Sequence, residues 1–119
     1  VDHIRDILVE LEIPYRILRL CAGDLGFTSA LTYDFELFST AQDRWLEISS
    51  VSTFESFQSE RLHLRYKEKD GSKHLVHTLN GSSLALPRVL AGILENCQTA
   101  EGIKIPKVLI PYTGFDLIS

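Results

Sequence analysis

The sequence contains no methionine and only two cysteines, Cys21 and Cys97, among its 119 residues. The two thiols form no C-x-x-C pair and have no histidine at zinc-ligand spacing, which argues against a zinc site or a disulfide framework. The pattern favours two buried free thiols in a protein of the reducing cytosol. Because even the first residue is not methionine, we expect a domain cut out of a longer protein.

Long apolar runs are also missing. No stretch approaches the roughly 20 residues of a membrane span, and charges throughout residues 1–11 argue against a signal peptide. We therefore expect a cytoplasmic protein without membrane contact.

Positive charge is scarce as well. The net charge is −4, and the one lysine-rich stretch, KEKDGSK at 67–73, is interrupted by acidic residues. Phosphate binding depends on clustered Lys and Arg, so this composition argues against a free-standing nucleic-acid binder and favours a solvated turn at 67–73.

The hydrophobic spacing predicts an α+β fold, an antiparallel β-sheet flanked by helices. It indicates an amphipathic helix over 2–12, a second helix beginning close to Pro87 and a short helix over 53–58. Alternating β-forming residues predict strands at 15–20, 32–38, 45–49, 61–67, 74–80 and 107–110.

The stretch WLEISS at 45–50 carries the first candidate site. Glu47 and Ser49 are expected on one face of the strand, and Ser50 at its end, where the chain can turn the hydroxyl toward the carboxylate. A carboxylate and a hydroxyl are oxygen ligands that suit Mg²⁺, which takes one or two protein ligands and completes its shell with phosphate and water. From these residues alone, a solvated strand face is the simpler explanation of the pattern.

The stretch HTLNGSSLALPR at 77–88 carries the second candidate site. Asn80 and Ser82 are small hydrogen-bonding residues where a strand runs into a helix, suited to a small polar substrate. Arg88 lies in the first turns of that helix, where a guanidinium can bind phosphate bidentately and stack on an aromatic ring. An N-cap serine and a surface arginine remain the alternative.

Two further groups favour structural roles. Asp34 and Glu36 share a strand face but are expected to be structural or solvated rather than an acid–base pair. The four histidines are scattered along the chain, so we expect no metal cluster from them.

Several linked motifs resemble the seryl-tRNA synthetase family of class II synthetases. They are PYRILRLCAGDLGF at 14–27, TYDFE at 32–36, EISSVS at 47–52 followed by FQ at 57–58, HTLNGS through Arg88 to LEN at 77–96, and IPKVLIPY at 105–112. The fourth of these, at 77–96, resembles motif 3 of the class, and the resemblance covers essentially the whole chain in order.

The resemblance implies roles for individual residues. Glu47 and Ser50 would bind the Mg²⁺ that bridges the ATP phosphates, and Arg88 would contact the γ-phosphate of a bent ATP and cover its adenine. Asn80 and Ser82 would line the pocket for L-serine. Glu47 and Arg88 would thereby be the catalytic residues, acting by position and charge neutralisation.

The same resemblance implies that residues 1–119 are the C-terminal portion of a catalytic domain. Motif 1, which makes the homodimer contact, motif 2 and the N-terminal arm that reaches tRNA(Ser) are absent from the sequence. We therefore expect the chain alone to be inactive, with a sheet edge exposed where motif 2 pairs. The alternatives are an amino acid:carrier-protein ligase, a non-catalytic synthetase paralogue, and an α+β binding domain without chemistry.

Overall fold

The computed structural model describes the whole chain, residues 1–119. Its elements follow in the order α1 (Asp2–Glu10), β1 (Tyr15–Arg19), β2 (Leu31–Ser39), β3 (Arg44–Glu55), α2 (Phe57–Leu62), β4 (Arg65–Lys67), β5 (Lys73–Leu75), β6 (Thr78–Gly81), α3 (Leu86–Asn96), β7 (Gln98–Thr99), β8 (Gly102–Lys104), the 3₁₀ helix η1 (Lys107–Leu109), α4 (Ile110–Thr113) and β9 (Leu117–Ile118). The predicted α+β class is confirmed.

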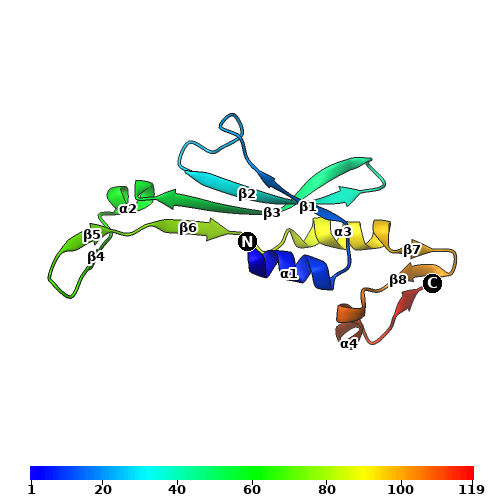
Figure 1. Cartoon of the computed structure of the whole chain (residues 1–119). Helices are drawn as coiled ribbons and strands as arrows, with labels where there is room; N and C mark the ends of the chain where they lie inside the picture. Colours follow the sequence, from blue (N-terminus) through cyan, green and yellow to red (C-terminus); the bar gives the residue numbers. More distant parts are fainter.

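The centre of the fold is a four-stranded antiparallel sheet with the strand order β1-β2-β3-β6 (Figure 1). β4 and β5 form a separate two-stranded ribbon, and β7, β8 and β9 form a small sheet near the C-terminus. α1 and α3 pack against one face of the four-stranded sheet, which we call the helix-covered face. The opposite face is called the polar face below.

The hydrophobic core lies between this sheet and its two helices. Alternation along β2 turns Phe35 and Leu37 to the helix-covered face, where both are fully buried. Burial of such side chains contributes about 1.5–3 kcal/mol each. The buried cluster consists of Ile4, Leu8, Leu11, Ile13, Phe35, Leu37, Ile48, Val89 and Ile93.

α3 is held unusually close to β2. A Cβ at Gly92 would lie 1.8 Å from Leu37 Cδ2, so only glycine allows this approach. At the end of the helix, Asn96 Nδ2 donates to the carbonyl oxygen of Phe38 at 2.9 Å. These contacts determine where α3 lies on the sheet and therefore where its first turn, with Arg88, is placed.

Several predicted elements are confirmed. The helix over 2–12 is α1, the strands over 15–20 and 32–38 are β1 and β2, and the second helix begins next to Pro87, which occupies its first turn. The predicted strand over 45–49 is the first part of β3, which continues to Glu55.

Four predictions were wrong in detail. The predicted strand 61–67 is reduced to β4, because Arg61 and Leu62 form the end of α2. Residues 53–55 belong to β3, and the short helix α2 starts later, at Phe57, because Thr53 pairs with Leu31 on one side and Leu79 on the other. The predicted strand 74–80 is split into β5 and β6, which belong to different sheets. Residues 107–110 form η1 and the start of α4, since Pro111 occupies the first turn of a helix and does not border a strand.

The molecule is long and flat, with extents of 65 × 34 × 18 Å. Its radius of gyration is 19.2 Å, against about 13.5 Å for a compact chain of this length. Fifteen of the 119 residues are buried, and large apolar side chains such as Phe27 and Leu79 are exposed. None of the helices has the length and apolar character needed to span a membrane.

Candidate functional site

The polar face of the four-stranded sheet collects side chains from three strands. In the register of β2 and β3, Asp34 lies opposite Ser50, and Glu36 lies opposite Glu47. Directly opposed residues of an antiparallel pair share a face. The two candidate metal ligands therefore lie beside two further acidic residues on one surface.

A β-bulge brings Glu47 and Ser50 onto this face together. Residues three apart on a regular strand point to opposite faces, but the β2–β3 register shifts between Phe35 and Glu36, which inserts one extra residue into β3. Ile48 and Ser49 are both buried as a result. The expectation that Ser49 shares the face of Glu47 was therefore wrong, and Ser50 lies within the strand rather than at its end.

Neither candidate metal ligand, Glu47 or Ser50, has its side chain bound to another group of the protein. The Glu47 side chain is exposed and makes no ion pair, and no hydrogen bond involves the Ser50 hydroxyl. Ser50 donates only its backbone N–H, to Ser82 Oγ at 3.1 Å. The structure contains no group of three or more His, Cys, Asp or Glu side chains able to hold a metal. A carboxylate and a hydroxyl that are both free of partners fit a magnesium ion that is otherwise bound by phosphate.

The junction after β6 places Ser82 against β3. Its N–H donates to the carbonyl oxygen of Ser50 at 3.1 Å, while its Oγ accepts the N–H of the same residue. Ser49 Oγ donates in turn to the Ser82 carbonyl oxygen. Because Ser82 Oγ accepts in this contact, its own hydroxyl proton stays available to a ligand.

Asn80 extends the same surface along β6. It pairs with Ser52, whose hydroxyl is 2.7 Å from the Thr32 hydroxyl on the polar face. The Asn80 side chain is exposed and makes no hydrogen bond within the chain. Asn80 and Ser82 are thus adjacent on the polar face, as the sequence motif requires.

Arg88 reaches the edge of this surface from the first turns of α3. Its Nη1 donates to the carbonyl oxygen of Glu47. The backbone supports the arrangement, because the N–H of Ala85 donates to the Ile48 carbonyl oxygen at 2.7 Å and ties the start of α3 to β3. The guanidinium is otherwise exposed and keeps further N–H groups for a ligand.

A family profile described as "tRNA synthetase class II core domain (G, H, P, S and T)" matches residues 1–97. The chain belongs to the class II tRNA synthetase core family. The resemblance found in the sequence motifs is confirmed at this level.

Curated proteins similar to this chain are named serine–tRNA ligases. The ligase of Finegoldia magna is 53% identical over 118 residues, which are 98% of this chain and 28% of that protein. The ligase of Salinibacter ruber is 56% identical over 107 residues, 88% of this chain and 25% of that protein. The chain therefore spans about a quarter of the length of the curated relatives it matches.

Solved structures agree with the fold. The seryl-tRNA synthetase from Pyrococcus horikoshii, complexed with ATP, superposes with a TM-score of 0.89 and 38% identity, over 99% of this chain and 28% of that one. The cytoplasmic serine–tRNA ligase from Naegleria fowleri, in complex with AMP, gives a TM-score of 0.86 and 30% identity with the same coverage.

Two further acidic residues, Asp34 and Glu36, lie on the polar face of this class II core, beside Ser50 and Glu47. Glu36 accepts Arg16 Nε–H at 2.5 Å, which fits the structural role expected for it. Asp34 Oδ1 is buried without a hydrogen-bond partner. The shared face of the two acids follows from their alternation with the buried Phe35, as the sequence analysis expected.

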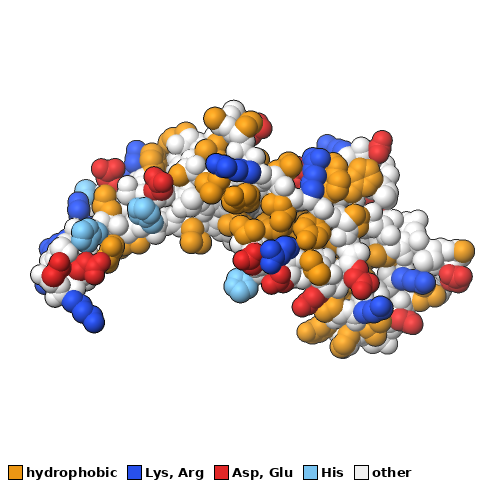
Figure 2. Space-filling view, in the orientation of Figure 1, with side chains coloured by type: hydrophobic (Ala, Val, Ile, Leu, Met, Phe, Trp, Pro, Cys, Tyr) orange, Lys and Arg blue, Asp and Glu red, His pale blue; other side chains and the backbone are white.

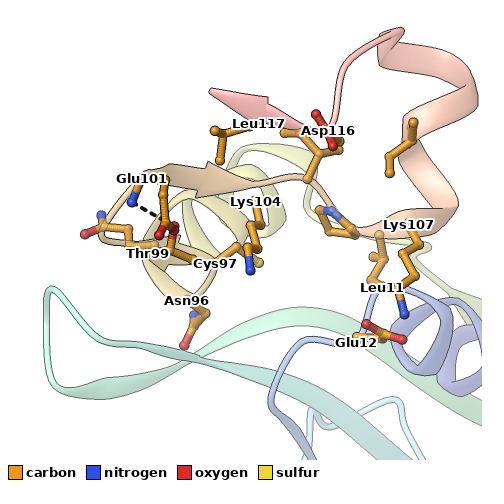
Figure 3. Close-up of a pocket in the computed structure, with 14 residues that line it drawn as sticks. Leu11, Glu12, Asn96, Cys97, Thr99, Glu101, Lys104, Lys107, Asp116 and Leu117 are labelled. Atoms are coloured by element: carbon orange, nitrogen blue, oxygen red, sulfur yellow. Dashed lines mark hydrogen bonds between the residues drawn. The ribbon is translucent and has the colours of Figure 1, made fainter. Parts of the chain in front are cut away.

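The predicted residues lie on an open surface, and neither of the two principal cavities is lined by any of them. The larger cavity, of about 670 Å³, lies between the end of α1 and the C-terminal sheet (Figure 3). Its wall carries charges of both signs, including Glu12 and Lys104, and the Cys97 thiol, whose pKa is raised by burial. This mixed lining does not select one ligand chemistry.

Proposed function

We propose that the protein is a serine–tRNA ligase, which activates L-serine with ATP to seryl-adenylate and transfers it to tRNA(Ser). Residues 1–119 are proposed to be the C-terminal portion of its catalytic domain. The observation that carries the proposal is the gathering of Glu47, Ser50, Asn80 and Ser82 on the polar face, with Arg88 at its edge. Relatives named serine–tRNA ligase over 98% of the chain support it.

In this proposal Glu47 and Ser50 would hold a magnesium ion at the ATP site. The ion would supply charge neutralisation to the leaving pyrophosphate. Arg88, anchored by one N–H to the Glu47 carbonyl oxygen, directs its remaining N–H groups at the γ-phosphate. Because the anchor is backbone, the guanidinium is positioned before ATP arrives, and less of its conformational freedom is lost on binding.

Asn80 and Ser82 would bind the serine. The Ser82 hydroxyl is oriented by the Ser50 N–H, and the Asn80 amide has no competing partner. A pocket that hydrogen-bonds the substrate hydroxyl rejects alanine, because its polar groups would be left unpaired. The serine carboxylate then attacks the α-phosphate, and no covalent enzyme intermediate is needed.

The incomplete core of the chain supports the assignment to a larger domain. Leu79, Leu86 and Leu90 are exposed around α3 and β6, where a larger catalytic domain would cover them. The proposed whole enzyme is a cytoplasmic homodimer that binds tRNA through its N-terminal arm. We expect no serine-dependent exchange from the 119-residue chain alone.

The test is serine-dependent ATP–pyrophosphate exchange by the full-length protein that contains this chain, followed by serine transfer to tRNA. Glu47→Gln and Arg88→Ala are expected to lower exchange about 100-fold or more, the usual effect of removing one preorganised electrostatic contact. Glu10→Gln and Arg19→Ala are matched controls, since both side chains are exposed and unpaired away from the site. Absence of serine-dependent exchange in the unaltered protein, or transfer to a carrier protein in place of tRNA, contradicts the proposal.

A further inference from the structure

The two-stranded ribbon of β4, β5 and the turn between them, residues 65–75, projects from one end of the molecule (Figure 1). Every residue from Arg61 to Gly71 is exposed, so the ribbon adds almost nothing to the core. Short two-stranded ribbons are marginally stable by themselves. This one forms three consecutive residue pairs, from Arg65–Leu75 to Lys67–Lys73.

The turn is locked by its own side chains. Ser72 Oγ donates to Asp70 Oδ1 at 2.6 Å, and the Ser72 N–H donates to the same oxygen at 2.9 Å. These bonds lower the pKa of Asp70 below its usual range, the side-chain bond most strongly. Since the Ser72 proton is given to Asp70, the His74 Nε2 lying 3.0 Å from Ser72 Oγ is the donor of that contact. A rigid ribbon loses little conformational entropy when a ligand binds.

Charge on the ribbon differs sharply from the rest of the chain. Residues 65–75 hold four of the 12 Lys and Arg of the sequence and two of its 16 acidic residues. Figure 2 shows basic, histidine and acidic side chains together at this end of the molecule, away from the apolar surface at its centre. The acidic residues belong to the turn rather than to the strands, and Asp70 is already bonded to Ser72. The interruption seen in the sequence therefore does not neutralise the strand faces.

Strand pairing sorts these residues into two faces. Lys67 lies opposite Lys73, and Arg65 lies opposite Leu75, so the three basic side chains share one face. Tyr66 lies opposite His74 on the other face, with ring centroids 5.6 Å apart and planes inclined by 36°. Tyr66 is 48% exposed, so this aromatic pair offers an accessible ring surface.

We infer that the ribbon is an RNA-binding surface, whose basic face contacts phosphates and whose Tyr66–His74 face stacks an unpaired base of the tRNA substrate. This inference rests on the proposed function, which supplies the RNA. The combination of stacking rings with basic side chains is how proteins bind single-stranded nucleic acid. An acidic protein partner would use the charges and leave the aromatic pair without a role.

The position of the ribbon suits this role. Asn80 follows Leu75 by five positions, which places the base of the ribbon within about 18 Å of the proposed serine-binding residue along extended chain. A tRNA end that delivers its acceptor nucleotide to the polar face from this side passes the ribbon. The contact would be additional to the N-terminal arm of the proposed enzyme.

The test compares two triple variants of the full-length protein, with labelled tRNA(Ser) binding measured by fluorescence anisotropy at several salt concentrations. Arg65→Gln, Lys67→Gln and Lys73→Gln together are expected to raise the Kd roughly tenfold or more and to lower the slope of log K against log salt by about 2 to 3. Arg5→Gln, Lys104→Gln and Lys107→Gln remove the same charge elsewhere and serve as the control. Tyr66→Ala should weaken binding severalfold, whereas Tyr66→Phe keeps the ring and should bind normally.

Serine-dependent pyrophosphate exchange is measured on the same preparations, and circular dichroism verifies folding. The ribbon variant should keep wild-type exchange. An unchanged Kd and salt slope, or an equal loss in the control variant, overturns the inference, as does a ribbon variant whose only change is in self-association. The binding assay decides about the ribbon even if the unaltered protein shows no exchange, a result that contradicts the proposed function instead.

Discussion

Replacement of Gly92 by alanine tests how α3, and with it Arg88, is held on the sheet. The new Cβ would lie 1.8 Å from Leu37 Cδ2 and 2.8 Å from Leu37 Cγ. Carbon atoms in contact normally lie about 3.5–4.0 Å apart, so the helix or the leucine must move by about 2 Å. Leu37 is fully buried between β2 and α3 and has no open space to enter.

Two effects oppose each other in this substitution. Alanine is about 1 kcal/mol better than glycine inside a helix. Overpacking of a filled core costs about 1–3 kcal/mol, and a displacement of this size belongs at the upper end of that range. We therefore expect Gly92→Ala to lower the free energy of unfolding by about 2 kcal/mol.

Urea denaturation of the 119-residue chain, followed by circular dichroism, measures this change. With a slope of about 1–3 kcal/mol per molar urea, the midpoint should fall by about 1 M. Gly23→Ala is the matched control, because a Cβ there meets no atom within 4 Å and the midpoint should not fall. If the Gly92→Ala chain has the same urea midpoint as the unaltered chain, or a higher one, the reasoning is refuted. Helix propensity would then outweigh the clash with Leu37.

A double variant identifies the clash as the cause. Leu37→Ala alone should cost about 2–5 kcal/mol by leaving a cavity. Added to Gly92→Ala it should cost less, because the new methyl group then occupies part of that cavity, and a coupling of about 0.5–3 kcal/mol is expected between groups in contact. Strict additivity of the two changes would contradict direct contact between these residues.

Two further predictions concern the thiols and the end of α3. The expectation of two buried thiols was wrong for Cys21, which is exposed, while Cys97 is partly buried and has a raised pKa. At neutral pH a thiol reagent should therefore label Cys21 first, and Cys21→Ser should abolish the fast phase of labelling. Equal labelling rates for the two thiols would contradict this assignment. Asn96→Ala removes the donor to the Phe38 carbonyl oxygen and should lower the free energy of unfolding by about 1–3 kcal/mol in the same urea assay. Gln98→Ala, in the exposed strand β7 that follows α3, should have little effect.

Local sequence signals were sufficient for much of the fold. Alternation in TYDFELF identified the buried side of β2, with Phe35 and Leu37 at its centre, because side chains in a strand alternate between faces. Pro87 marked the start of α3, because proline fits the first helical turn and disrupts later ones. Both signals depend only on backbone geometry within a few residues.

The same signals failed where pairing partners lie far apart in the sequence. Thr53 to Glu55 read as part of a short helix, but pairing with Leu31 on one side and β6 on the other keeps them in β3. The C-terminal strands β7 to β9 are two or three residues long and have no periodicity to detect. In both regions, contacts between distant segments outweigh local preference.

For the candidate site, too, sequence and tertiary structure contributed different information. The sequence by itself determined which residues are present, because the identity and order of Glu47, Ser50, Asn80, Ser82 and Arg88 follow from the motifs. Only the tertiary structure decided how they meet. The bulge in β3 depends on the register with β2, and the bond from Arg88 to the Glu47 carbonyl oxygen depends on how α3 packs on the sheet; both are long-range contacts that no local spacing specifies.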